Sequence, residues 1–134
     1  MDNTILIWKY LLPQLTENEE FSKYIDEKYI YPIAALEGTP VPYIIYRRDS
    51  LVPSYSKYNP GFSGWTNNIS ISLSVYSDNY NESAYIANLI RDIFENYTYE
   101  DEDIKIHPIE LTNSLESVNN NVFEQTLIFS VTAE

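Results

Sequence analysis

The chain has no cysteine, three glycines and a single histidine among its 134 residues. Without cysteine it has no disulfide, no thiolate nucleophile and no cysteine metal site. So few glycines cannot form a Gly-rich phosphate loop, and the lone His107 excludes a metal site built on a histidine pair. No G-x-S-x-G nucleophile motif is present either. We therefore interpret the chain as non-enzymatic, with no catalytic residues and no bound cofactor or metal.

Basic residues are also scarce: eight Lys and Arg face twenty Asp and Glu, which gives a formal net charge of −12 and a pI near 4.3. Binding to nucleic acids and to anionic membranes both depend on Lys and Arg, so this balance argues against both. The first apolar stretch is broken by Lys9 and Pro13, far short of the ~20 residues that cross a bilayer. The length fits one domain, residues 1–134.

Residues 3–26 are predicted to form a broken helical segment. Apolar side chains spaced by three or four indicate one helical stripe, formed by Ile5, Trp8, Leu12 and Leu15. Pro13 should end or kink this helix, because proline lacks an N–H and crowds the preceding turn. Thr16 and Glu19 have the spacing of a capping box, which predicts a second helical start.

Two strands and a loop are expected next. Residues 29–34 are aromatic and β-branched, and Pro32 within them cannot donate to a ladder, which predicts an edge strand. Residues 41–49 form a second expected strand. Residues 51–65 combine prolines, glycines, serines and aromatics without clear periodicity, so we expect a long loop or hairpin tip.

The clearest pattern covers residues 67–76, where apolar residues alternate with Asn and Ser and indicate a strand with one buried face. A helical stripe predicts a helix over about 80–97. Further on we expect an acidic connector over 99–103, a strand from Ile104 through Leu111 interrupted at Pro108, a turn at 119–121 and a strand over 123–131. The order α-β-β-β-α-β-β indicates an α+β fold, a largely antiparallel sheet of about 4–5 strands with two helical segments packed on it.

Candidate interface residues are concentrated in and next to the expected loop. Aromatic side chains there have no period that assigns them to a core, and Tyr and Trp are enriched at protein interfaces. We single out Tyr55, Tyr58, Phe62 and Trp65. They could equally fold back over the sheet and complete the core, or stack on a sugar. Arg47 and Arg48 are adjacent on a strand, so they point to opposite faces and could meet carboxylates within the chain or across a subunit contact.

An acidic run and the single histidine are the remaining candidates for metal binding or catalysis, and neither fits such a role. The acidic run Glu100–Asp103 lacks the alternating ligand spacing and the glycine of a calcium loop, so we interpret it as a solvated connector. His107 lies between Ile106 and Pro108 on an expected strand. A structural or solvent-facing role for His107 is favoured over general-base chemistry.

Several segments together resemble a known family over nearly the full length and in element order. They are the broken N-terminal helix, Tyr29-Ile30-Tyr31-Pro32, Pro42-Tyr43-Ile44-Ile45-Tyr46-Arg47, the alternating strand from Ile69 to Tyr76, Ser77-Asp78-Asn79-Tyr80, and the helical stripe Ala84, Ala87, Ile90 and Ile93. With a closing two-strand unit, this pattern resembles the tail-completion or tail-terminator proteins of long-tailed bacteriophages and prophages.

The resemblance implies a structural virion protein that forms a homo-oligomeric ring, typically a hexamer, at the head-proximal end of the tail tube. Such a ring ends tube growth and joins the tail to the head, so the implied partners are the tail tube protein and a head-completion or connector protein. DNA would only pass through the ring, without specific binding. The implied location is the head–tail junction of the virion, and the host cytoplasm during assembly. Alternatives are another ring of the head–tail connector, or a small carbohydrate- or peptide-binding module that uses the 51–65 loop.

Overall fold

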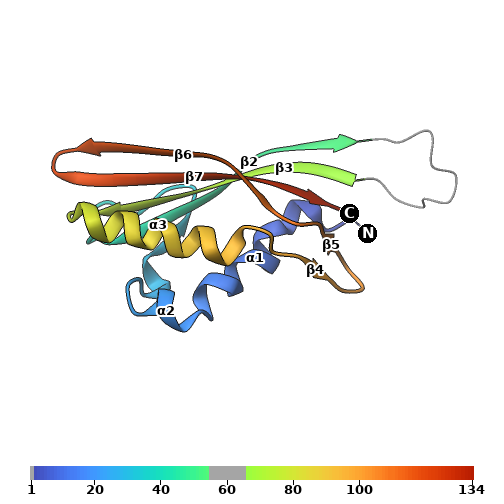
Figure 1. Ribbon diagram of the computed structural model, residues 1–134, viewed down its shortest axis with the longest axis horizontal. Helices are drawn as coiled ribbons and strands as arrows, with labels where there is room; N and C mark the ends of the chain where they lie inside the picture. Colours follow the sequence, from blue (N-terminus) through green and yellow to red (C-terminus); the bar gives the residue numbers. More distant parts are fainter. Residues whose placement is uncertain (1, 55–65) are drawn as a thin grey trace, which may run out of the picture.

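A seven-stranded sheet organises the computed structural model, which describes residues 2–54 and 66–134 (Figure 1). The helical elements are η1 (Thr4–Leu6), α1 (Ile7–Thr16), α2 (Glu19–Ser22), η2 (Glu27–Tyr29) and α3 (Tyr80–Phe94). The strands are β1 (Ile30–Pro32), β2 (Tyr43–Ser54), β3 (Thr66–Ser77), β4 (Tyr99–Glu100), β5 (Lys105–Ile106), β6 (Glu110–Asn119) and β7 (Val122–Ala133). The predicted α+β class is confirmed, with more strands than the four or five expected because residues 99–119 form three of them.

The sheet is largely antiparallel, as predicted. Its order is β1-β2-β3-β7-β5-β4, and β6 also pairs with β7. Only β1 runs parallel to its neighbour, β2. The long strand β7 pairs with β3 along one side, and with β6 and then β5 along the other. The sheet therefore has β1 and β2 at one edge and β6 at the opposite edge.

The core lies between the sheet and the helices. Figure 1 shows α1, α2 and α3 on one side of the sheet. The alternation that predicted β3 directs its apolar side chains to this side, where all are buried: Ile69, Ile71, Leu73 and Val75. Phe94 of α3 lies at the centre of this layer, between Trp8 of α1 and Phe129 of β7. Helix α3 thus joins the N-terminal helix to the sheet.

The N-terminal helix is broken, but not where the sequence predicted. Pro13 lies inside α1, which continues to Thr16. Leu11 and Leu15, on either side of the proline, are fully buried, so their packing outweighs the ~3 kcal/mol that an interior proline costs. The second start is capped by Asn18, whose Oδ1 accepts from Phe21 N at 2.9 Å, and not by the predicted Thr16 and Glu19 box.

The buried face of this helix also differs from the predicted stripe. Thr4, Ile7, Leu11 and Leu15 are buried, whereas Ile5 is 64% exposed. Trp8 and Leu12 are only partly buried at the margin of the core. Because nearly every residue from Ile5 to Leu12 is apolar, the spacing alone defines more than one stripe, and packing against the sheet selects one.

Two strands extend further than predicted. Residues 51–54 belong to β2, where Leu51 pairs with Ile69 and Ser54 with Thr66, so the loop expected over 51–65 cannot begin at Leu51. Strand β6 continues to Asn119, well past the predicted end at Leu111. Most of its residues are exposed, because it is an edge strand and both of its faces meet water. An edge strand of this kind carries no apolar alternation.

The predicted turn at 119–121 is confirmed. Asn119 pairs with Val122, and the two residues between them, Asn120 and Asn121, have φ values of 50° and 62°. Positive φ at both central positions is the geometry of the tight two-residue hairpin, which Asn adopts readily. The turn therefore fixes the register of β6 on β7.

Helix α3 begins where Ser77-Asp78-Asn79 predicted and ends at Phe94, three residues before the predicted end. Asn79 is the N-cap, and its Oδ1 accepts from Glu82 N at 2.9 Å. Ser77 Oγ in turn donates to Glu82 Oε1 at 2.9 Å and accepts from Asn79 N at 3.1 Å. The Glu82 carboxylate also suits the positive end of the helix dipole.

We expect Asn79→Ala to lower the free energy of unfolding by about 1 kcal/mol, because the first turn of α3 loses its side-chain cap. Urea denaturation followed by circular dichroism measures the change. The control is Asn88→Ala on the exposed face of the same helix, which should leave stability unchanged or slightly higher because Ala favours helix. Equal stability of the two variants would contradict the capping role.

Candidate interaction surfaces

Arg47 and Arg48 lie exposed on β2, at the edge of the sheet. Arg47 Nε is 3.8 Å from Asp49 Oδ1, with both side chains well exposed, so this ion pair adds little stability. Within the residues that the structure describes, Arg48 forms no ion pair. Strand alternation places Arg48 on the side of Ile44 and Tyr46, which face the helices, and Arg47 on the open face.

The other predicted interface residues lie outside the described residues. They are Tyr55, Tyr58, Phe62 and Trp65. Their role as a contact surface stays a prediction.

Within residues 2–54 and 66–134, both long edges of the sheet are open. β1 covers only Ile44 to Tyr46 of β2, so Arg47 to Ser54 pairs on one side alone. In the described part of the chain, β6 pairs only with β7. Asn119 and Val122 close a two-residue hairpin, so Asn119 forms hydrogen bonds with β7. Counting from Asn119 towards the start of β6, alternate residues such as Val118 and Glu116 direct their backbone N–H and C=O groups away from β7. Open edges are sites where another chain can add.

Among the described residues, the most exposed large hydrophobic side chains lie just after β1, in and beyond a tight turn. Ala34 N donates to Pro32 O at 2.7 Å, and Ile33 between them has a φ of 67°. This is a γ-turn with positive φ, which is rare and strained, and strongly atypical for a β-branched residue. Ile33 N donates to Tyr46 O at 2.9 Å, which anchors the turn to β2. Ile33 is 73% exposed and Leu36 is 72% exposed, and we call this pair the β1 knob.

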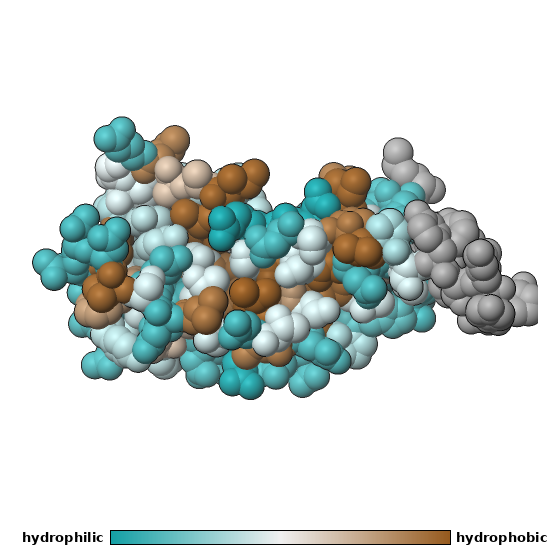
Figure 2. All heavy atoms as spheres, turned by 90° about the horizontal axis from the view of Figure 1, so that it is seen from above, coloured by the Kyte–Doolittle hydropathy of each residue, from teal (hydrophilic) through white to brown (hydrophobic). Residues whose placement is uncertain are grey.

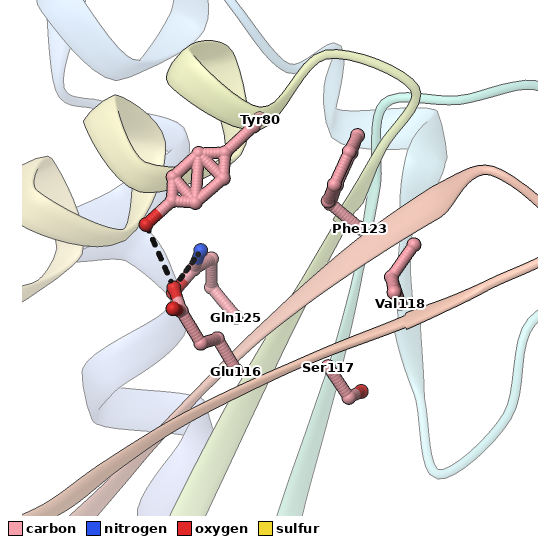
Figure 3. Close-up of a pocket in the computed structure, with 6 residues that line it drawn as sticks. All are labelled: Tyr80, Glu116, Ser117, Val118, Phe123 and Gln125. Carbon is pink, nitrogen blue, oxygen red and sulfur yellow. Dashed lines mark hydrogen bonds between the residues drawn. The ribbon is translucent and has the colours of Figure 1, made fainter.

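A pocket of about 260 Å³ lies at the opposite edge, between the tip of the β6–β7 hairpin and the start of α3 (Figure 3). We call it the β6 pocket, and it is lined by Tyr80, Glu116, Ser117, Val118, Phe123 and Gln125. The Tyr80 and Phe123 rings meet edge to face at 5.6 Å. Val118 is 61% exposed although it is aliphatic. The pocket is therefore largely an apolar surface that the chain itself leaves uncovered.

One carboxylate forms the polar wall of this pocket. Glu116 Oε2 accepts from Tyr80 Oη at 2.9 Å and from Gln125 Nε2 at 3.1 Å, as the dashed lines in Figure 3 show. The hydrogen bond to Glu116, and then its negative charge, raises the pKa of Tyr80. Within the described residues, Glu116 Oε1 accepts no hydrogen bond. Glu116 is thus oriented by two donors with one oxygen left for a further one.

A second aromatic group lies on the open face of the sheet. The rings of Tyr43 and Tyr76 stack at 4.7 Å, and Tyr76 Oη donates to Glu124 Oε1 at 3.1 Å. Burial first, then the negative charge of Glu124, raises the pKa of Tyr76 to about 12. Figure 2 looks onto this face, where hydrophobic residues are interspersed with hydrophilic ones. The open face is therefore not one continuous apolar patch.

The acidic connector has a structural role. Asp101 Oδ1 accepts from the backbone N–H groups of Asp103 and Ile104, and Tyr99 Oη donates to Asp101 Oδ2 at 2.6 Å. The Tyr99 bond, followed by the backbone bonds, lowers the pKa of Asp101. Over 2–54 and 66–134, no group of three or more His, Cys, Asp or Glu is placed to hold a metal ion. His107 lies near the surface, with Nε2 3.6 Å from Glu134 Oε2.

The fold is similar to that of a chain in the solved structure of a native gene transfer agent (GTA) virion particle. The TM-score is 0.75, and the 13% identical alignment covers 92% of this chain and 91% of that chain. A second solved structure aligns over 98% of this chain and 95% of its own, with a TM-score of 0.62 and 8% identity. No protein-family model and no curated protein matches the chain. What these likenesses establish is a shared fold.

Sequence reasoning missed the surfaces that the structure makes most accessible. Ile33 was assigned to a strand, and no local pattern signals a γ-turn there. Val118 and Glu116 lie on a strand that the sequence did not predict beyond Leu111. An aliphatic residue between polar neighbours is the available signal at Val118, between Ser117 and Asn119. In the part of the chain that the structure describes, no helix is both long and apolar enough to cross a membrane.

Proposed function

We propose that this chain is a structural protein of a phage-like virion, which forms a ring at the head-proximal end of the tail tube, ends tube growth and joins tail to head. The observation that carries the proposal is the fold match to a chain of a gene transfer agent virion over more than nine-tenths of both chains. The resemblance of the sequence to tail-completion proteins supports the same assignment. No catalytic step is part of this role.

The two open edges of the sheet support assembly into a ring. A ring needs two different surfaces on each subunit, one of which binds the other surface on its neighbour. The β2 edge and the β6 edge are different, exposed, and on opposite sides of the same sheet. Strand edges of this kind are normally blocked or covered in a stable protein. A neighbouring subunit on each side would cover both.

The charge balance is compatible with a ring around a DNA channel. At a net charge of −12 the surface repels phosphates, so DNA can pass without the retention that a basic lumen would cause. DNA is therefore a passing cargo in this proposal and not a bound ligand.

The experiment combines oligomer size with capping of tail tubes. Light scattering over a wide concentration range, with negative-stain imaging of the same fractions, should show a ring, and a hexamer is expected. Purified tail tubes of the cognate particle should then carry one ring at one end, and tube protein polymerised with the chain present should give shorter tubes. An unrelated acidic protein of similar size is the control and should change neither.

Other outcomes separate the alternatives. A chain that binds the head portal but not the tube end would favour another ring of the head–tail connector. A chain that stays monomeric and leaves tubes uncapped contradicts the proposal. A sugar titration that changes tryptophan fluorescence, with the change lost in Trp65→Ala, would instead favour the carbohydrate-binding module.

A further inference from the structure

The β1 knob and the β6 pocket lie on opposite edges of one sheet at a similar level. Ile33 is bonded to Tyr46 of β2. From Tyr46 a row of paired residues crosses the sheet through Leu73 and Leu127 to Ser114 of β6. Ser114 is two residues before Glu116 and four before Val118, which line the pocket. Within one molecule the whole sheet separates the two surfaces, so they can meet only between copies.

Both surfaces are largely apolar, and one is a pair of exposed side chains while the other is a pocket. The knob offers two aliphatic side chains more than 70% exposed, and the first of them, Ile33, is held by a strained turn that is anchored to β2. The pocket offers Val118 and the rings of Tyr80 and Phe123 around about 260 Å³. This volume is below the ~300–1,000 Å³ of small-molecule sites. A pocket of this size can hold aliphatic side chains of another protein chain.

The charged residues beside the two surfaces are also of opposite sign. Arg48 lies two residues from Tyr46, which anchors the knob, and projects on the helix side of the sheet. Glu116 pairs with the buried Gln125, so it projects on the helix side as well. Its Oε1 accepts no hydrogen bond within the described residues. A cation is thus next to the knob and an oriented carboxylate is next to the pocket.

We propose that the β1 knob of one copy binds the β6 pocket of the next, with Arg48 of the first copy paired to Glu116 of the second. The proposal deepens the ring assignment and rests on it. Since the two surfaces differ, the contact is head-to-tail and each copy uses both. Repetition of the contact closes a ring where the rotation between neighbours allows it. The turn strain at Ile33 then has a function, because it holds the Ile33 side of the knob in its bound position before assembly.

The absence of cysteine makes this contact directly testable. Leu36→Cys and Val118→Cys are combined in one chain and treated with a short bis-maleimide. A ladder of cross-linked oligomers is expected, ending at the ring. Each single variant alone should give no cross-linked dimer, because in a head-to-tail contact neither position lies next to the same position of a neighbouring copy. An equimolar mixture of the two single variants should stop at a cross-linked dimer.

A matched pair of positions controls for random collision. The control double variant combines Val118→Cys with Ile5→Cys. Ile5 is an exposed aliphatic residue on η1 that lies outside the proposed contact. This pair should give no ladder. Dimers from either Leu36→Cys or Val118→Cys alone would show a symmetric contact and overturn the proposal.

Charge exchange tests the polar half of the contact. Arg48→Glu should weaken assembly at least about tenfold, because it places two carboxylates together. Glu116→Arg should do the same, whereas the double variant R48E/E116R should recover assembly. The double variant lacks the hydrogen bonds from Tyr80 and Gln125 to Glu116, as the single variant Glu116→Arg does. Recovered assembly in the double variant therefore cannot come from restoring these local bonds. If both single variants assemble normally, the pairing is wrong.

The outcomes separate this contact from the ring function. Rings that cap tubes but show no 36–118 cross-link overturn the contact and leave the function. A cross-linked ladder from a chain that does not cap tubes overturns the function and leaves the contact. No ladder either in solution or on tube ends overturns the contact.

Discussion

Phe94→Ala is expected to lower the free energy of unfolding by about 3–5 kcal/mol, the range for removing a buried aromatic ring. Phe94 is fully buried, and its ring meets Trp8 at 6.2 Å and Phe129 at 5.8 Å, both edge to face. Phe94 therefore links α1 to β7, beside the direct contact of Trp8 with Tyr46 of β2. Because small domains are stable by only ~5–15 kcal/mol, this single change removes a large part of the total.

Urea denaturation followed by circular dichroism measures this loss, and tryptophan fluorescence in a Trp65→Phe background, where Trp8 is the one tryptophan, reports separation of α1 from the sheet. Asn88→Ala on the exposed face of α3 is the control, and its stability should stay within about 0.5 kcal/mol of the original chain. A loss below about 1 kcal/mol for Phe94→Ala would mean that the site collapses around the cavity and that α1 is held by other contacts.

The strands that sequence patterns predicted best are those with one apolar face toward the helices and one polar face away from them. In β3 the alternation of Ile, Leu and Val with Ser is complete, and its apolar residues are all buried. In β7 the alternate residues Gln125, Leu127, Phe129 and Val131 are likewise buried. The alternation of apolar and polar residues is visible in these strands because one face packs against the helices and the other does not. In β6 both faces meet water, so the same geometry leaves no pattern.

Local rules were less reliable where packing decides between similar options. The nearly continuous apolar run from Ile5 to Leu12 allowed a stripe on either side of the helix, and the sheet selected Ile7, Leu11 and Leu15. Pro13 carries a real local cost, but two buried leucines hold its helix together. In both cases the missing information is the position of the sheet, which no short window of sequence contains.

The candidate site was only partly accessible to sequence reasoning. Arg47 and Arg48 were singled out because basic residues are scarce, and the structure places both on an exposed edge. The knob and the pocket were not found, because they depend on a strained turn at Ile33 and on which strands lie at opposite edges of the sheet. Strand order is a property of the whole fold.

Tyrosine has a role here that the composition alone did not explain. The chain has thirteen tyrosines but only eight Lys and Arg to serve twenty carboxylates. Among the tyrosines that the structure describes, four hydroxyls donate to carboxylates: Tyr76 to Glu124, Tyr80 to Glu116, Tyr85 to Glu20 and Tyr99 to Asp101. Phenols thus act as donors to acidic groups where cations are few. This arrangement stabilises the carboxylates only while the tyrosines keep their protons.

We therefore expect the folded chain to lose stability steeply between pH 10 and pH 12. The pKa of Tyr76 is raised from 10.0 to about 12, chiefly by burial, and that of Tyr99 to about 12, chiefly by its hydrogen bond to Asp101. In the unfolded chain these hydroxyls ionise near pH 10. Between the two values the unfolded chain binds fewer protons than the folded chain, so the free energy of unfolding falls as pH rises. Below pH 10 this contribution is fully present.

Urea denaturation at a series of alkaline pH values measures the slope, and the ultraviolet absorbance of tyrosinate shows when the tyrosines ionise. The double variant Y76F/Y99F should be less stable at pH 7, because the hydrogen bonds to Glu124 and Asp101 are lost, but its stability should fall less steeply above pH 10. Repeating both series at about 1 M salt, where the Debye length is ~3 Å, separates this effect from general repulsion between negative charges. If the original chain and the double variant kept the same slope, the tyrosine–carboxylate pairs would not be the groups that link stability to alkaline pH.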